Sequence, residues 1–135
     1  MFIYDSDVLI DFLRGAEPAA SYVRDDLLRG RVCVSAMTVF ELRAGARSER
    51  QQQAVEALLA ATQIVPVDGA IAKMAGDWFR DLKAKGQETG AADCLIGATC
   101  ATADALLVTR NRRHFERMPE VKLSRLAGGI GTHAR

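Results

Sequence analysis

Short apolar runs alternate with longer amphipathic stretches along this chain. Five of the runs have the length and the aliphatic content of buried β-strands. These predicted strands cover residues 1–5, 32–34, 64–67, 106–109 and 121–123. Pro66 has no amide hydrogen to donate to a neighbouring strand, so we expect the third run to lie at an edge of its sheet or to end near this residue.

Most of the stretches between the strands place apolar side chains three or four residues apart, which predicts helices. The predicted helices cover residues 6–14, 18–29, 38–46, 50–61, 69–85 and 91–103, with a short helical turn at 114–118. Ser6 is a candidate N-cap of the first helix, and Gly15 is a candidate stop. The helix at 91–103 is apolar on nearly all sides, so a central position is expected.

Strands that alternate with helices are typical of a parallel sheet covered by helices on both faces. We therefore expect an α/β fold with three layers, α/β/α, around a central parallel sheet. A length of 135 residues suits a single domain spanning residues 1–135. The glycine-rich tail, residues 127–135, is expected to be loose.

The composition narrows the environment and the partners. Hydrophobic residues make up 49% of the chain, but no apolar stretch approaches the ~20 residues of a membrane span. The start of the chain lacks the basic segment of a secretory signal. The three cysteines show no CxxC spacing, so buried free thiols and a cytoplasmic location are expected. A net charge of +1 means that nucleic acid could bind only through local basic patches.

Four polar side chains are candidates for a shared site. In open α/β sheets, ligands bind beyond the carboxyl ends of the strands. Asp5 ends the first strand, Glu41 lies in the helix after the second, Asp93 begins the apolar helix and Asn111 follows the fourth strand. Crowded carboxylates raise one another's pKa, and a hard divalent cation such as Mg²⁺ relieves their repulsion. A helix N-terminus also favours Asp93, and Glu41 could be a solvated helix residue, so a structural role is open for both.

The segments around these residues resemble a known family. The motifs are Asp5-Ser6-Asp7 followed by an aliphatic run, residues 34–42 with Glu41 four positions before Gly45, residues 92–98 around Asp93, and residues 107–111 followed by His114-Phe115. In this order they resemble PIN-domain ribonucleases, and among them the VapC toxins of bacterial toxin–antitoxin pairs. Ser6 stands where the family more often has Thr, and Asn111 stands where some members have Asp.

The resemblance implies an endoribonuclease that leaves a 5′-phosphate and a 3′-hydroxyl. The crowded carboxylates predict that its cofactor is Mg²⁺, which Mn²⁺ could replace. The resemblance also implies an RNA substrate, a VapB-like antitoxin that blocks the site, and a homodimer. We expect Asp5 and Asp93 to be the metal ligands. Glu41 would bind through water or help to deprotonate the attacking water, and Asn111 would orient a water molecule or a second ion.

Other charged residues flank the four candidates. A basic rim that contacts phosphate is expected from Arg43, Arg47, Arg110, Arg112, Arg113 and His114, although each could be an ordinary solvated residue. His114 is predicted to be a positioning residue, with no carboxylate partner near it. Asp7 is predicted to be a supporting acid in the first helical turn, and Asp11 a surface residue.

Two other functions fit parts of the sequence. Asp5 and Asp7 also fit the DxDx pattern of haloacid-dehalogenase-like phosphatases, in which Asp5 would be a covalent nucleophile and Asp7 a general acid. The chain is short for that class and lacks its lysine motif and late acidic pair. The second rival is a PIN fold that only binds, with a site weakened by the neutral Asn111. Replacing Asp7 with Asn would separate the first rival from a nuclease.

Overall fold

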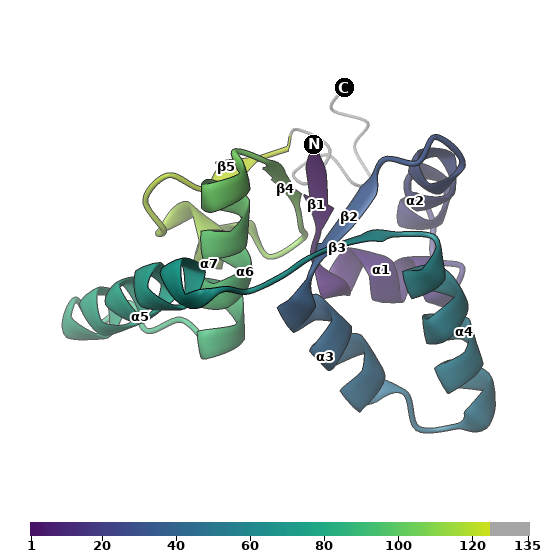
Figure 1. The fold of residues 1–135 in the computed structure, drawn as a ribbon, viewed down its shortest axis with the longest axis horizontal. Coiled ribbons are helices and arrows are strands. Elements are labelled where there is room, and N and C mark those ends of the chain that lie inside the picture. Colours follow the sequence, from purple (N-terminus) through teal and green to yellow (C-terminus); the bar gives the residue numbers. More distant parts are fainter. Residues whose placement is uncertain (125–135) are drawn as a thin grey trace.

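The computed structural model describes residues 1–124, which form a parallel sheet with helices on both of its faces (Figure 1). The five strands lie in the order β3-β2-β1-β4-β5, and every neighbouring pair is parallel. Their bounds are β1 (Phe2–Tyr4), β2 (Val32–Ser35), β3 (Gln63–Val65), β4 (Leu106–Val108) and β5 (Lys122–Leu123). The predicted tail, residues 127–135, lies outside the described residues.

Seven helices connect and flank the strands of the described chain. They are α1 (Ser6–Leu13), α2 (Ala19–Leu28), α3 (Ala36–Gly45), α4 (Glu49–Ala60), α5 (Gly69–Ala84), α6 (Ala91–Ala103) and α7 (Arg112–Glu116). Figure 1 shows α1–α4 on one side of the sheet and α5–α7 on the other. The prediction of a three-layer α/β/α fold is confirmed.

The alternation of side chains along the strands divides the core into two clusters. Ile3, Cys33 and Leu107 belong to the cluster that packs against α5 and α6. Their strand neighbours, such as Tyr4 and Val34, belong to the cluster under α1–α4. The central strands are therefore buried on both faces, which explains why their sequences are continuous apolar runs.

The predicted element boundaries shift by a few residues where polar caps decide them. Asp5, not Ser6, is the N-cap of α1, and its side chain accepts a hydrogen bond from the Ser6 backbone N–H. Ser35 caps α3, which therefore begins two residues before the predicted start. β3 ends before Pro66 and lies at the edge of the sheet, as its proline predicted. The last turn, α7, begins at Arg112 and not at His114.

The cysteine prediction is also confirmed. Cys33, Cys94 and Cys100 are all buried and free of disulfides. Burial raises the pKa of the Cys100 thiol to about 12, so this side chain stays an unreactive, apolar part of the core. Among the helices of residues 1–124, none combines the length and the apolar character that crossing a membrane requires.

Candidate active site

Asp5 lies where β1 ends and α1 begins, at the carboxyl edge of the sheet. Its backbone N–H donates to the Val108 carbonyl at 2.9 Å and ties it to β4. Oδ1 of the carboxylate accepts from the Ser6 backbone N–H at 2.8 Å, and Oδ2 accepts from the Thr109 hydroxyl at 2.6 Å. With 4% of its surface exposed, Asp5 is a buried carboxylate held in one orientation.

The environment of Asp5 disfavours its charged form. Its pKa is raised from 3.8 to about 7, mainly by burial and also by the negative charges of Asp7 and Asp93, and the Thr109 and Ser6 hydrogen bonds oppose this rise only in part. A buried acid with a strongly raised pKa among other acids is typical of a functional site.

Glu41 reaches the same edge of the sheet from α3. Its side chain is half-buried, and Oε1 accepts from the Ser6 hydroxyl at 3.0 Å. Burial raises the pKa of Glu41, and the charges of Asp93 and Asp7 act in the same direction. Ser6 therefore contributes its backbone N–H to Asp5 and its hydroxyl to Glu41, which links the two predicted acids.

Asp93 stands in the first turn of α6 and is half-buried. Its Oδ2 lies 3.1 Å from Nδ1 of His114 and 3.4 Å from Nδ2 of Asn111. The backbone N–H of Asn111 donates to the Thr109 hydroxyl oxygen at 2.9 Å, so the loop after β4 is fixed to the residue that also holds Asp5. The structure thus brings all four predicted site residues to one edge of the sheet.

The expectation that His114 has no carboxylate partner was wrong. His114 and Asp93 belong to different elements, α7 and α6, and their contact depends on how the loop after β4 folds back onto the start of α6. Thr109 was missed altogether, although it is fully buried and donates to Asp5. The available signal was its position, because Thr109 directly follows β4 and stands two residues before Asn111.

Asp7 and Asp11 lie beside the four candidates on α1. Oδ2 of Asp7 accepts from the Arg110 backbone N–H at 3.0 Å, which fits the predicted supporting role. Its Oδ1 is buried and has no hydrogen-bond partner within residues 1–124, and burial raises the Asp7 pKa. Asp11 is not the surface residue we expected, because its side chain is 16% exposed and pairs with the Arg110 guanidinium at 3.1 Å.

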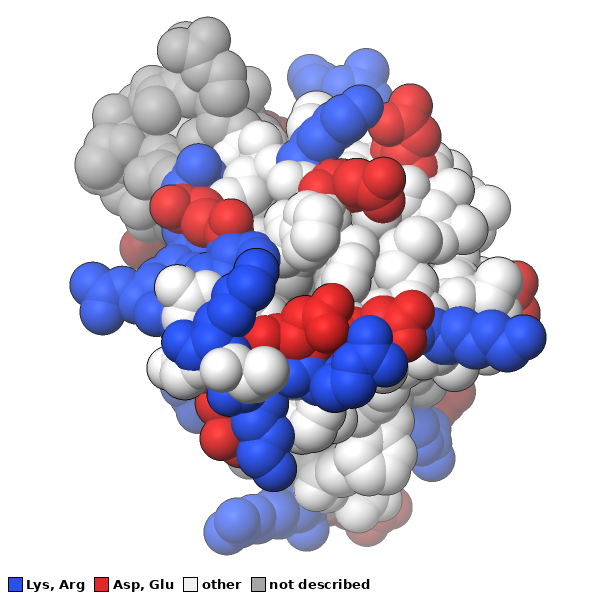
Figure 2. All heavy atoms as spheres, turned by 90° about the vertical axis from the view of Figure 1, so that its left-hand side faces the viewer, with Lys and Arg blue, Asp and Glu red and all other residues white. Residues whose placement is uncertain are grey.

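The predicted basic rim is largely engaged in ion pairs within the chain. Arg110 pairs with Asp11, Arg112 with Glu116, and Arg43 with Glu56. Arg47 and Arg113 are exposed and form no ion pair with the described residues. On the side of the molecule where α5 lies, Figure 2 shows basic and acidic side chains intermixed. Any phosphate contact by the paired arginines would compete with an existing carboxylate.

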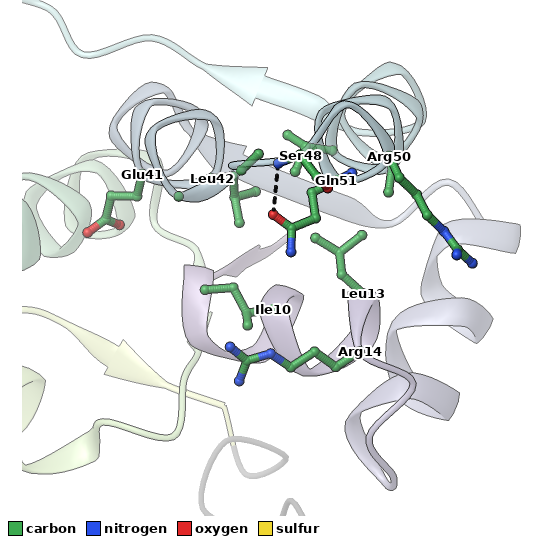
Figure 3. A pocket seen from close by; sticks show the side chains of 12 residues that line it. Ile10, Leu13, Arg14, Glu41, Leu42, Ser48, Arg50 and Gln51 are labelled. Atoms are coloured by element: carbon green, nitrogen blue, oxygen red, sulfur yellow. Dashed lines mark hydrogen bonds between the residues drawn. The ribbon is translucent and has the colours of Figure 1, made fainter.

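A pocket of about 490 Å³ opens next to Glu41, between α1, α3 and α4 (Figure 3). Ile10, Leu13 and Leu42 form an apolar part of its wall. The guanidinium groups of Arg14 and Arg50 lie at its border, and neither forms an ion pair within residues 1–124. An apolar hollow with cationic groups beside an acidic site suits a partner with apolar and acidic side chains.

The structure does not enclose a complete metal cage. Within the described part of the chain, no group of three or more His, Cys, Asp or Glu side chains is arranged closely enough to hold a metal ion. Mg²⁺ does not require one, since it usually keeps several waters and takes only one or two protein carboxylates. The oxygen donors of Asp5 and Asp93 are of the type that this cation prefers.

The sequence of this chain is similar to those of known nucleases. The family model of the PIN domain matches residues 2–121. Ribonuclease VapC10 of Mycobacterium tuberculosis strain H37Rv is 34% identical over 122 residues, covering 90% of this chain and 91% of the relative. The tRNA(fMet)-specific endonuclease VapC of Shigella flexneri is 28% identical over 121 residues, covering 87% and 91%.

Solved structures agree on the fold. The structure of DNA-bound VapBC from Salmonella typhimurium aligns with a TM-score of 0.78 at 26% identity, covering 91% of this chain and 96% of that one. VapBC2 from Rickettsia felis, bound to a promoter DNA fragment, aligns with a TM-score of 0.79 over the same shares, 91% and 96%. Its identity of 20% supports a common fold only.

Proposed function

This chain belongs to the PIN-domain family and, within it, to the VapC ribonucleases, and on that basis we propose that it is a Mg²⁺-dependent endoribonuclease toxin of a type II toxin–antitoxin system. The observation that supports this most is the meeting of Asp5, Glu41 and Asp93 at one sheet edge of a PIN fold. Its membership in this family overturns the phosphatase alternative for Asp5 and Asp7.

The residues of the site fit a divalent cation. The pKa values of Asp5, Glu41 and Asp7 are raised mainly by burial and also by neighbouring carboxylates, so their charged forms are disfavoured, and a bound cation would stabilise those charged forms. We propose Asp5 and Asp93 as the metal ligands, with Mn²⁺ able to replace Mg²⁺. When bound, the cation would polarise the scissile phosphate and stabilise negative charge on it.

The chain itself would supply orientation and proton transfer. Thr109 and Ser6 hold Asp5 in place from two sides. Glu41 is held by the Ser6 hydroxyl, and burial raises its pKa, which makes it a stronger base than an exposed carboxylate, so we propose that it helps to deprotonate the attacking water. Asn111 would orient water at the other end of the site through its side-chain amide.

RNA would approach along the cationic side chains near the acids. Arg47 and Arg113 are the first candidates for phosphate contacts, because both are exposed and form no ion pair with the described residues. Arg110 is a weaker candidate, since its guanidinium already pairs with Asp11. The chain would act in the cytoplasm, where its buried free thiols remain reduced.

The proposed partner is a VapB-like antitoxin. Apolar side chains of the antitoxin would enter the pocket beside Glu41, and acidic ones would meet Arg14 and Arg50 (Figure 3). A segment seated there would cover the approach to Glu41 and so inhibit cleavage. We also propose a homodimer, which light scattering of the purified chain would test.

A cleavage assay tests the proposed activity. Antitoxin-free protein should cut single-stranded or looped RNA with Mg²⁺ or Mn²⁺ and lose this activity in excess EDTA, and the new ends should be 5′-phosphates. In cells, expression should arrest growth alone but not together with the antitoxin. Full-rate cleavage in EDTA, or healthy growth with abundant soluble protein, would contradict the proposal. The absence of cleavage together with binding of RNA would favour the alternative of a PIN fold that only binds.

A further inference from the structure

We propose that His114 is the positioning residue for Asp93, acting through a hydrogen bond from its Nδ1–H to Oδ2 of the carboxylate. The bond would hold Oδ2 in place and leave the other oxygen, Oδ1, free to bind a cation. The link to the cation rests on the proposed function, whereas the hydrogen bond itself can be tested in the metal-free protein.

The geometry places the imidazole directly against the acid. Nδ1 of His114 lies 3.1 Å from Oδ2 of Asp93, which is a hydrogen-bonding distance. Its neighbour on α7, Phe115, is fully buried and anchors the short helix in the core. The imidazole is 40% exposed, so it can be changed without opening the core.

The position of the proton decides what His114 does. Nδ1 of a neutral imidazole either donates or accepts, and two partners compete for it: Oδ2 of Asp93, and the Asn111 amide nitrogen at 2.8 Å. An ionised carboxylate offers only lone pairs, so an unprotonated Nδ1 at 3.1 Å would set its own lone pair against a negative charge. The carboxylate therefore favours the tautomer with hydrogen on Nδ1.

The consequence concerns the second oxygen of Asp93. No hydrogen bond from residues 1–124 reaches Oδ1, while Oδ2 is approached by both His114 and Asn111. A carboxylate in a helical first turn can rotate about its last bond and present either oxygen. Holding Oδ2 removes that freedom. Groups that orient a metal ligand in this way typically contribute about 10–100-fold to metal affinity or activity.

Replacing His114 with Asn or with Gln distinguishes the roles of the two ring nitrogens. The Asn amide nitrogen is two bonds from Cβ, as is Nδ1, whereas the Gln amide nitrogen is three bonds from Cβ, as is Nε2. His114→Asn should therefore keep kcat within about 3-fold of the wild type, while His114→Gln and His114→Ala should lower kcat by about 10–100-fold with little change in KM. Thermal unfolding of all three should match the wild type.

Other outcomes would overturn the proposal. Rescue by Gln but not by Asn would mean that Nε2 contacts RNA. A rise in KM at constant kcat in His114→Ala would mean that His114 contributes to substrate binding and not to the orientation of Asp93. Wild-type kinetics in His114→Ala would mean that the residue has no role.

A readout without cleavage completes the test. In the metal-free protein, ¹⁵N NMR should show hydrogen on Nδ1 of His114, and Asp93→Asn should shift the imidazole toward the Nε2–H tautomer. Titration calorimetry should show Mg²⁺ binding about 10–100-fold weaker in His114→Ala than in the wild type. An Nε2–H tautomer in the wild type would overturn the proposal, because Asn111 would then orient the imidazole. If the wild type bound Mg²⁺ but cut no RNA, the proposed function would be wrong. The tautomer of His114 and the Mg²⁺ affinities of the variants would still test the role of His114.

Discussion

Asp5 and Asp93, the two proposed metal ligands, are held in opposite ways. Asp5 is 4% exposed and is fixed by a backbone N–H and a buried hydroxyl at the end of a central strand. Asp93 is half-buried on a helix, and the groups that approach it are the side chains of His114 and Asn111. One ligand is part of the core, and the other belongs to a polar cluster at the surface.

The difference separates two contributions to a metal site. The position of Asp5 is set by β-sheet pairing. Because this carboxylate is buried, its ionisation lowers the free energy of unfolding of the metal-free protein. The position of Asp93 depends on two neighbouring side chains, so its contribution can be adjusted without disturbing the core. Changes at Asp5 should therefore alter both stability and activity, whereas removal of a neutral side chain that contacts Asp93 should alter mainly activity.

The largest expected effect comes from removing each ligand in turn. Asp5→Asn and Asp93→Asn should each lower Mg²⁺-dependent cleavage by at least about 100-fold, because each removes an anionic metal ligand. Asp5→Asn should also raise the stability of the metal-free protein by about 1 kcal/mol at pH 8, or about 3–4 °C in Tm. The gain is partial because an amide offers one oxygen to the two donors, Ser6 and Thr109.

Cleavage assays and thermal unfolding in EDTA measure the two effects. Asp77→Asn is the matched control, since Asp77 is an exposed acid on α5 that pairs only with Arg80 among the described residues. An active, Mg²⁺-dependent Asp93→Asn variant would refute its assignment as a ligand.

A second, smaller effect is the pH dependence of stability. Asp5 has a pKa of about 7 in the folded chain against 3.8 ordinarily, so the folded state binds more protons between these values. The free energy of unfolding of the metal-free protein should therefore fall as pH rises from about 4 to about 7, and this group should add no further change above that. Glu41 and Asp7, whose pKa values are also raised, act with the same sign.

Urea denaturation in EDTA at several pH values tests this slope. Asp5→Asn should reduce the dependence of the free energy of unfolding on pH. Asp93→Asn should leave most of this dependence unchanged, because Asp93 is only half-buried. Saturating Mg²⁺ should stabilise the wild type most at high pH, where Asp5 is ionised. A metal-free wild type whose stability rises through this pH range would contradict the burial argument for Asp5.

The same contrast explains what could be predicted from the sequence. Asp5 and Asn111 were predicted because each follows an apolar strand, and Glu41 because it lies in the helix after the second strand; parallel strands bring such positions to one edge of the sheet. The alternating order of strands and helices was enough to predict the three layers. Asp93 was found because a single acid interrupts an otherwise apolar helix.

The second set of contacts was not predictable in the same way. The Thr109–Asp5 and His114–Asp93 hydrogen bonds join residues far apart in the chain, and their existence depends on how the loop after β4 packs against α1 and α6. The pairing of Arg110 with Asp11, which engages a guanidinium that was predicted to contact phosphate, has the same origin. Hydrophobic periodicity specifies which elements form, but it contains no information about which polar side chains meet across them.

Asn111 provides the smallest and most discriminating test, because it lies on the Asp93 side of the comparison and is neutral. Its amide nitrogen is 3.4 Å from Oδ2 of Asp93, so Asn111→Asp would place a second carboxylate beside the first. We expect Mg²⁺ affinity to rise on the order of 10-fold and metal-free stability to fall by about 1 kcal/mol, since the added charge attracts the cation when it is bound and repels Asp93 when it is not. Asn111→Ala should reduce cleavage less than Asp5→Asn does.

Calorimetric titration of Mg²⁺ into the wild type, Asn111→Asp and Asn111→Ala measures whether the Asn111 side chain affects the affinity for the cation. The backbone N–H of Asn111, which donates to Thr109, is retained in both variants, so changes in affinity report on the side chain alone. Equal affinities in the wild type and Asn111→Asp would place the side chain outside the cation's surroundings. Asn111 would then matter only for the turn into α7 and for the Thr109 hydrogen bond that steadies Asp5, and the Asp93 side of the site would depend on His114.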